Sequence, residues 1–166
     1  DYQAHVYRAT PADLAKILDT VIPAEHRVVL PPALPAEWHV RIAARAATSY
    51  VDGSPTSLSA TELDAIDTVV TACRVAIAET GTIVLDAAPD QGRRALTLVP
   101  DHHVVVVLAN QIVASVPEAL ARLDPTAPLT FISGPSATSD IEFQRVQGVH
   151  GPRNLDVIVV DSDPGH

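Results

Sequence analysis

Cysteine is almost missing from this sequence. The 166 residues contain a single one, Cys73. One thiol cannot form a disulfide within the chain, and it cannot supply the four thiolates that usually hold an iron–sulfur cluster. Because Cys73 lies in an apolar stretch, we expect it to be a small buried residue.

Positive charge is also scarce. Eleven Lys and Arg residues stand against 20 Asp and Glu residues, which gives a formal net charge of −9. A nucleic-acid-binding surface needs a basic stripe, so this class of function is excluded. No apolar run approaches the ~20 residues of a membrane span and no secretory signal is present, so we expect a cytoplasmic protein. The chain has no initiator methionine, which leaves a preceding N-terminal segment open.

Familiar cofactor and metal motifs are missing too. The sequence has no G-x-G-x-x-G, no Walker A motif, no H-E-x-x-H and no C-x-x-C, so nucleotide and metal binding lack their usual support. Asp101, His102 and His103 resemble a metal patch. Adjacent side chains on a strand point to opposite faces, however, so the two histidines cannot easily share an ion. We expect no metal and no cofactor.

What the sequence does contain is an alternation of short aliphatic runs and capped helices. This alternation predicts an α/β layered fold with a largely parallel sheet, in one domain spanning residues 1–166. Capping boxes are expected at Ser59 and Ser115, and the helix after Ser115 should turn Val116, Leu120 and Leu123 inward. The expected strands cover 26–30, 48–51, 68–71, 83–85, 104–108, 129–132 and 155–160, and the expected helices begin at 10–13, 35–38, 59–62 and 115–118.

The stretch 133–142 is the first candidate binding site. It follows the expected strand at 129–132 and combines Gly134, Ser136, Thr138 and Asp140 in a loop of small residues. Ser139 and Glu142 fit a further capping box, so the loop should run into a helix N-terminus. Unpaired backbone N–H groups and the helix dipole would then favour a carboxylate or a phosphate. The alternative is that these residues only turn the chain and cap a short helix.

A second candidate loop covers residues 79–82. Gly81 allows close backbone approach to a ligand, and Thr80 and Thr82 offer hydroxyl groups. Glu79 follows an apolar segment, so burial would raise its pKa and suit it to acid–base or nucleophilic catalysis. A tight turn with capping threonines, and an ion pair between Glu79 and an arginine, are the structural alternatives.

His150 and Arg94 complete the candidate residues. His150 lies in the constrained sequence Gly148-Val-His-Gly-Pro152. It serves there either as a general base or as a hydrogen-bond donor that orients a ligand, or it holds the loop through a backbone hydrogen bond. Arg94 belongs to the only adjacent pair of basic residues. Such a pair clamps an anion or is simply solvated.

Several strings of residues together resemble one family. They are Ile77-Ala-Glu-Thr-Gly-Thr82, the double arginine followed by Leu-Val-Pro100, the His-Val-Val-Val run, Gly134-Pro-Ser-x-Thr-x-Asp-Ile-Glu142 and Gly148-Val-His-Gly-Pro152. In this order, over roughly residues 60 to 160, the chain resembles the lactate-utilisation (LUD) domain family, and its C-type members in particular. Many members have an arginine where this chain has Ala137. That departure leaves backbone N–H groups, Ser136 and Thr138 to bind an anion.

The resemblance implies a three-layer, Rossmann-like α/β fold similar to the ribose-phosphate isomerase, CoA-transferase and formyltetrahydrofolate cyclo-ligase superfamily. It also implies a cytoplasmic role in oxidising L-lactate to pyruvate beside two separate iron–sulfur subunits. From the loops themselves we expect that a subunit of this kind binds a small carboxylate or a partner at 79–82 and 133–138. The rival hypothesis is a stand-alone enzyme acting on an acyl or phosphorylated metabolite. In that case Glu79 is the nucleophile or base, by analogy of fold alone.

Overall fold

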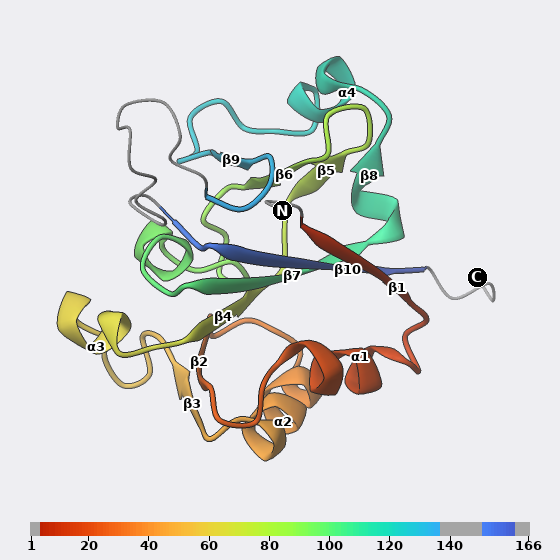
Figure 1. Ribbon diagram of the computed structural model, residues 1–166. Helices are drawn as coiled ribbons and strands as arrows, with labels where there is room; N and C mark the ends of the chain where they lie inside the picture. The colour runs from red at the N-terminus through yellow and green to blue at the C-terminus, as the bar shows by residue number, and fades with distance from the viewer. Residues whose placement is uncertain (1–3, 137–150, 162–166) are drawn as a thin grey trace, which may run out of the picture.

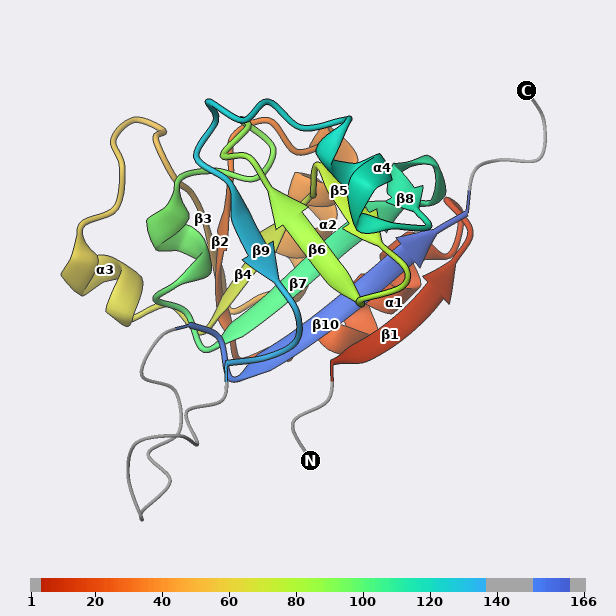
Figure 2. The same cartoon turned by 90° about the horizontal axis from the view of Figure 1, so that it is seen from above.

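A six-stranded parallel sheet forms the centre of the molecule (Figures 1 and 2). The computed structural model describes residues 4–136 and 151–161. The strand order is β1-β10-β7-β4-β2-β3, and every neighbouring pair is parallel. The six strands are β1 (His5–Ala9), β2 (Arg27–Leu30), β3 (Thr48–Val51), β4 (Thr68–Thr71), β7 (His102–Leu108) and β10 (Asn154–Val160).

The valine run of β7 explains why this strand lies in the middle. Its side chains alternate between two cores, with Val104 and Val106 in one and Val105 and Val107 in the other. All four are at most 1% exposed. A strand covered on both faces reads as a continuous aliphatic run, as expected for a parallel sheet between two layers.

Two amphipathic helices cover one face of this sheet. Helix α1 (Leu14–Val21) and helix α2 (Ala36–Arg45) lie together below the sheet in Figure 1. Leu14 and Leu18 of α1 and Ile42 of α2 pack into the same core as Val104 and Val106. Leu14, Leu18 and Val21 are spaced by four and three residues, which places these apolar side chains on one face of α1.

A second, smaller sheet covers the other face. It has the order β8-β5-β6-β9, with β5 (Val75–Ile77), β6 (Thr82–Leu85), β8 (Ile112–Val113) and β9 (Thr130–Ile132). The β5–β6 and β6–β9 pairs are antiparallel. The sequence predicts strands at 83–85 and 129–132 but does not predict that they leave the parallel sheet. The α/β class and the largely parallel central sheet are confirmed.

Three short helical segments complete the second layer. Helix α3 (Ala60–Asp64) and the 3₁₀ helix η1 (Arg94–Thr97) cover the end of the main sheet around Val29 and Val69. Helix α4 (Val116–Leu120) packs on the outer side of the small sheet through Ala119. Within the described ranges, none of the helices combines the length and the apolarity that a membrane crossing requires.

The two predicted capping boxes have different outcomes. Ser59 Oγ accepts a hydrogen bond from the Glu62 N–H at 3.2 Å, and a Glu62 carboxylate oxygen accepts from the Ser59 N–H at 2.7 Å, so this box is confirmed. The Ser115 box is wrong, because its hydroxyl donates to the Glu118 carboxylate and accepts from no backbone group. Leu120 is 54% exposed instead of turned inward, since the five-residue helix presents Ala119 to the core.

Candidate functional site

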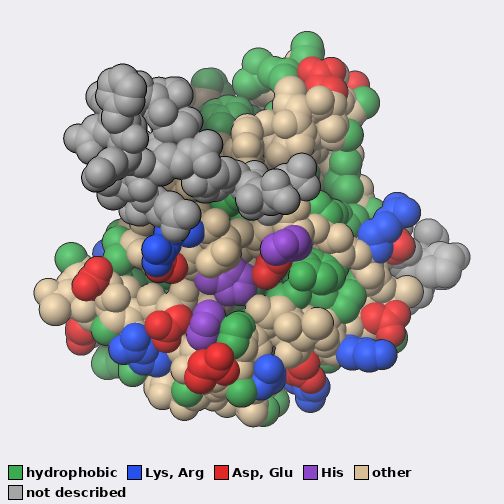
Figure 3. All heavy atoms as spheres, viewed as in Figure 1, with side chains coloured by type: hydrophobic (Ala, Val, Ile, Leu, Met, Phe, Trp, Pro, Cys, Tyr) green, Lys and Arg blue, Asp and Glu red, His purple; other side chains and the backbone are tan. Residues whose placement is uncertain are grey.

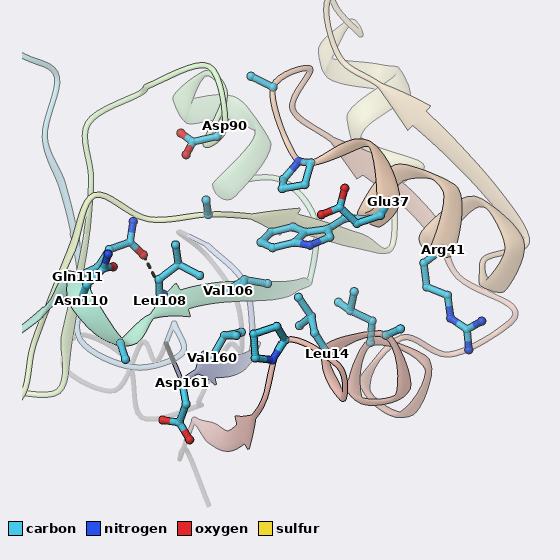
Figure 4. A pocket seen from close by; sticks show the side chains of 18 residues that line it. Leu14, Glu37, Arg41, Asp90, Val106, Leu108, Asn110, Gln111, Val160 and Asp161 are labelled. Atoms are coloured by element: carbon cyan, nitrogen blue, oxygen red, sulfur yellow. Dashed lines mark hydrogen bonds between the residues drawn. The ribbon is translucent and has the colours of Figure 1, made fainter. Parts of the chain in front are cut away.

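A crevice of about 550 Å³ opens beyond the carboxyl ends of β4, β7 and β10 (Figure 4). Val106 and Leu108 of β7 and Val160 of β10 form apolar walls, and Leu14 of α1 and Trp38 of α2 line the opposite side. In open α/β sheets, ligands bind at this edge. The crevice is therefore the site that the fold itself favours.

Carboxylates surround the apolar centre of the crevice. Asp90, Glu37 and Asp161 all line it, and Figure 4 shows Asp90 and Glu37 on one side and Asp161 on the other. Asp90 is half-buried, and burial raises the pKa of its carboxyl group, with the Asp86 carboxylate raising it further. Arg41 also lines the crevice, but its guanidinium pairs with Asp19 on α1.

Hydrogen bonds to backbone groups hold the loops that carry these groups. The Ala72 N–H donates to the Asp90 carbonyl at 3.1 Å, which fixes the loop next to the end of β4. Gln111, in the 3₁₀ helix η2 (Ala109–Gln111), accepts from the Leu108 N–H at 2.9 Å and donates to the Cys73 carbonyl at 2.8 Å. The side-chain amide of Gln111 is thus occupied by structural hydrogen bonds. Asn110 also lines the crevice and can contact a ligand there.

The sequence interpretation missed these residues. It places the candidate anion site in the loops 79–82 and 133–138 and not at the residues that line this crevice. Asp161 directly follows the last buried strand, and Asp90 lies in a loop after another. A polar residue at the end of a buried strand is the signal that would have found both.

Three predicted residues line a different and smaller pocket. Arg94, Gly134 and Ser136 border a space of about 180 Å³ that His103 and Leu155 also line. This pocket therefore lies near the amino ends of β7 and β10, not at the carboxyl ends. The cause is β9, which belongs to the second sheet and delivers its following loop to the opposite edge.

Two short hydrogen bonds define this pocket. The Ser136 N–H donates to the Pro152 carbonyl at 2.8 Å, which joins the two glycine-containing stretches of the sequence. Arg94 Nη1 donates to Thr130 Oγ1 at 2.7 Å. In the described part of the chain, no carboxylate forms an ion pair with Arg94. A guanidinium with open donors beside serine hydroxyls is suited to a small anion.

Loop 79–82 is the turn of the β5–β6 hairpin. Thr80 Oγ1 donates to Thr82 Oγ1 at 2.7 Å, and Thr82 Oγ1 is bonded to Ser133 Oγ at 2.7 Å. The two predicted loops therefore do meet. Gly81, Thr82 and Gly134 also border an apolar groove of about 560 Å³ between the two sheets.

Glu79 has a structural contact in this turn. Its carboxylate accepts a hydrogen bond from the Val116 N–H at 3.3 Å, at the start of α4. The side chain is exposed, so the expected burial is wrong, because a hairpin turn stays at the surface. The predicted ion pair with an arginine is not formed among the described residues either. Its catalytic role stays a prediction.

Three further predicted residues, Thr138, Asp140 and His150, lie outside the described residues, as does the capping box at 139–142. Five of the other predicted residues border the small pocket or the apolar groove, namely Gly81, Thr82, Arg94, Gly134 and Ser136. Thr80 borders neither and is bonded to Thr82. The use of these five residues in binding therefore rests on the pockets that they border.

A row of histidines also escaped the sequence interpretation. His102 Nε2 contacts Asp156 Oδ2 at 2.8 Å and its Nδ1 contacts Thr68 Oγ1 at 3.1 Å. Thr68 Oγ1 also contacts His26 Nδ1 at 2.7 Å, and Asp156 Oδ1 contacts His5 Nδ1 at 3.1 Å. Figure 3 shows histidine side chains gathered on this face. These residues come from five separate segments of the chain, so no local sequence motif indicates that they lie together. They are His5, Asp156, His102, Thr68 and His26.

His103 points to the other face of β7, as the alternation of a strand predicts. Its Nε2 is bonded to Thr71 Oγ1 at 2.8 Å, and its Nδ1 has no partner within the described part of the chain. No group of three or more His, Cys, Asp or Glu side chains among the described residues is arranged to hold a metal ion.

A comparison with known protein families identifies the family of this chain. The model of the LUD domain matches residues 2–160. The chain belongs to the LUD domain family. The prediction made from the ordered strings is thereby confirmed, and the match also takes in the first third of the chain.

The similar proteins include relatives named lactate utilization protein C. The protein from Deinococcus radiodurans is 46% identical over 164 residues, which covers 96% of this chain and 74% of the relative. The protein from Shouchella clausii is 31% identical over 125 residues, covering 70% of this chain and 54% of the relative. This chain therefore spans about three quarters of one relative and about half of the other.

A solved LUD-like structure agrees with the fold. The crystal structure of a DUF162 family protein from Deinococcus radiodurans superimposes with a TM-score of 0.77 at 40% sequence identity. The alignment covers 95% of this chain and 88% of that chain.

Proposed function

We propose that this chain is a non-cluster subunit of a system that oxidises L-lactate to pyruvate and works beside separate iron–sulfur subunits. The observation that carries the proposal is the 46% identity, over nearly the whole chain, to a protein named lactate utilization protein C. A single cysteine agrees with it, since one thiolate cannot hold a cluster and the electrons must pass to other subunits.

The smaller pocket lined by Arg94, Gly134 and Ser136, called the Arg94 pocket from here on, is the proposed place for the small carboxylate. Its volume of about 180 Å³ suits an acid of a few carbon atoms. Arg94 offers N–H donors for the carboxylate, and Ser133 and Ser136 border the same space. An arginine fork binds a carboxylate through two parallel hydrogen bonds.

The direct test is a pull-down of the tagged chain from cells grown on L-lactate. We expect iron–sulfur proteins to co-purify, visible as brown absorbance, together with lactate oxidation in the eluate. A chain that elutes alone, colourless and inactive, would overturn the subunit assignment.

The carboxylate site is tested separately on the purified chain. Arg94→Gln should weaken the binding of L-lactate or pyruvate, followed by NMR, at least tenfold, because it removes the cation. Arg8→Gln, which changes an exposed arginine on β1, is the matched control. Equal affinities for the two variants would remove the Arg94 pocket from the proposal without touching the subunit assignment.

The rival function is a stand-alone enzyme with Glu79 as nucleophile or base. Glu79 is exposed and bonded to the start of α4, and this geometry does not favour a catalytic carboxylate. If Glu79→Gln lowered α4 stability but left turnover on an acyl or phosphorylated metabolite unchanged, Glu79 would be removed from the mechanism.

A further inference from the structure

The crevice at the carboxyl edge differs in chemistry from the Arg94 pocket. Its walls come from Leu14 and Leu18 of α1, Trp38 of α2 and Val106 and Leu108 of β7. Trp38 is half-buried and packs on the same core as the two helices. An indole beside aliphatic side chains forms a wall that suits a flat, apolar ring.

The charges that line the crevice disfavour an anion. Asp90, Glu37 and Asp161 all face this space, and its cation, Arg41, is already paired with Asp19. Arg41 also points away from the apolar centre in Figure 4. Carboxylates around a partly desolvated space repel a carboxylate or a phosphate. Nor does the sequence contain a glycine-rich phosphate loop.

The same groups can hydrogen-bond an uncharged ligand. The half-buried carboxylate of Asp90 accepts hydrogen bonds from the hydroxyl or N–H groups of such a ligand. Asn110 adds an amide that donates and accepts. A few polar groups around a large apolar surface are typical of a small-molecule site.

We propose that this crevice binds an uncharged planar ring compound that carries carbonyl or hydroxyl groups. Nucleosides and quinones share this chemistry. The site is distinct from the proposed carboxylate pocket, and the proposal does not rest on a role in lactate oxidation.

Trp38 makes the site directly observable, because it is the only tryptophan of the chain. The emission of Trp38 is followed on excitation near the red edge of its absorption while adenosine, AMP or 1,4-naphthoquinone is added. Calorimetry confirms that any change saturates. Saturation with adenosine identifies a nucleoside-type ligand, and saturation with the quinone identifies a quinone-type ligand. If neither compound saturates, the proposal is overturned.

The charge argument has its own test. If adenosine binds, AMP should bind at least fivefold more weakly, because the carboxylates that line the crevice repel its phosphate. If only the quinone binds, AMP should not bind at all. Asp161→Asn should reduce the discrimination against AMP, whereas Asp64→Asn on α3, also exposed, should not. If AMP binds the unaltered chain as tightly as the uncharged compounds do, the proposed ligand class is wrong.

A pair of leucine variants tests the location. Leu108 is 42% exposed and lines the crevice, while Leu120 is 54% exposed on α4, outside it. Both positions tolerate truncation because both side chains already contact water. Leu108→Ala should weaken ligand binding at least threefold, and Leu120→Ala should leave it unchanged. Equal effects would place the ligand elsewhere.

Discussion

Cys73 is buried in the layer between the two sheets, where it is 1% exposed. Burial, with Asp90 and Asp86 nearby, raises the pKa of its thiol to about 12. The thiolate is the reactive form, so at pH 8 the folded chain should resist iodoacetamide for hours. Mass spectrometry across a urea series should show alkylation that follows unfolding. Rapid alkylation in buffer alone would show that Cys73 is accessible.

His103 makes stability depend on pH. Burial, and to a lesser extent His102, lowers the pKa of His103 to about 3, against about 6.5 in an unfolded chain. Between these values the unfolded chain binds the proton more readily. The stabilisation is therefore complete above pH 6.5 and decreases as the pH falls toward 3.

We expect the free energy of unfolding to fall by about 1.4 kcal/mol for each pH unit below 6, measured by urea denaturation between pH 7.5 and 5. His103→Gln should be less stable at pH 7.5 but should show a shallower pH dependence over the same range. An equally steep dependence in that variant would assign the effect to other groups.

At the residue scale, local chemistry was predictable and neighbours distant in sequence were not. The burial of Cys73 and the opposite directions of His102 and His103 follow from apolar context and strand alternation, and both are confirmed. The burial of Glu79 was wrong, because an apolar run before a glycine does not reveal that a surface hairpin follows. The partnership of His102 with Asp156 required the register of two strands.

At the scale of elements, the helix caps offer a matched comparison. Ser59 accepts a backbone hydrogen bond at the start of α3, and Ser115 accepts none at the start of α4. Ser59→Ala should therefore destabilise the chain by about 1 kcal/mol, and Ser115→Ala by only a few tenths. Urea denaturation measures both. Equal losses would contradict the difference between the two caps.

Helices and buried strands were predictable because each carries its own periodicity. The strands at 48–51 and 68–71 and the capping box at Ser59 lie where the pattern places them. The second sheet was not predictable. The strands at 83–85 and 129–132 were predicted, but their antiparallel partners, which place them in a second sheet, are set by tertiary packing.

At the scale of the whole molecule, the row of His5, Asp156, His102, Thr68 and His26 links five adjacent segments of the sheet. Thr68→Val keeps the shape of the side chain but removes the hydroxyl group between two imidazoles. We expect a loss of about 1–3 kcal/mol in the free energy of unfolding, because each imidazole loses a partner in a largely buried place.

Thr20→Val on α1 is the control for this change. Its exposed hydroxyl donates to the Lys16 carbonyl, and the loss should stay within about 0.5 kcal/mol. Nitrogen NMR shifts of His26 and His102 should change in Thr68→Val only. Unchanged shifts together with unchanged stability would show that the row is not connected in solution.

At this scale, the position of the candidate site could not be predicted from the sequence. The crevice lies at the carboxyl edge of the parallel sheet, where the general rule expects a ligand, but the loops chosen from sequence lie elsewhere. Gly134 and Ser136 follow β9, and only the assignment of β9 to the second sheet reveals that they reach the opposite edge. Strand order cannot be read from local pattern, so the position of a loop cannot be read either.

The pairing of β1 with β10 has a consequence for how the protein is made. His5 and Asp156 lie in register although 151 positions separate them. Ribosomes add about 5–20 residues per second, so β1 leaves the exit tunnel many seconds before its neighbour exists. During that time α1 and β2 have no completed sheet to pack on. This sheet should therefore be completed only after β10 has been made, and a nascent chain that stalls before β10 should be an early target for chaperones and proteases.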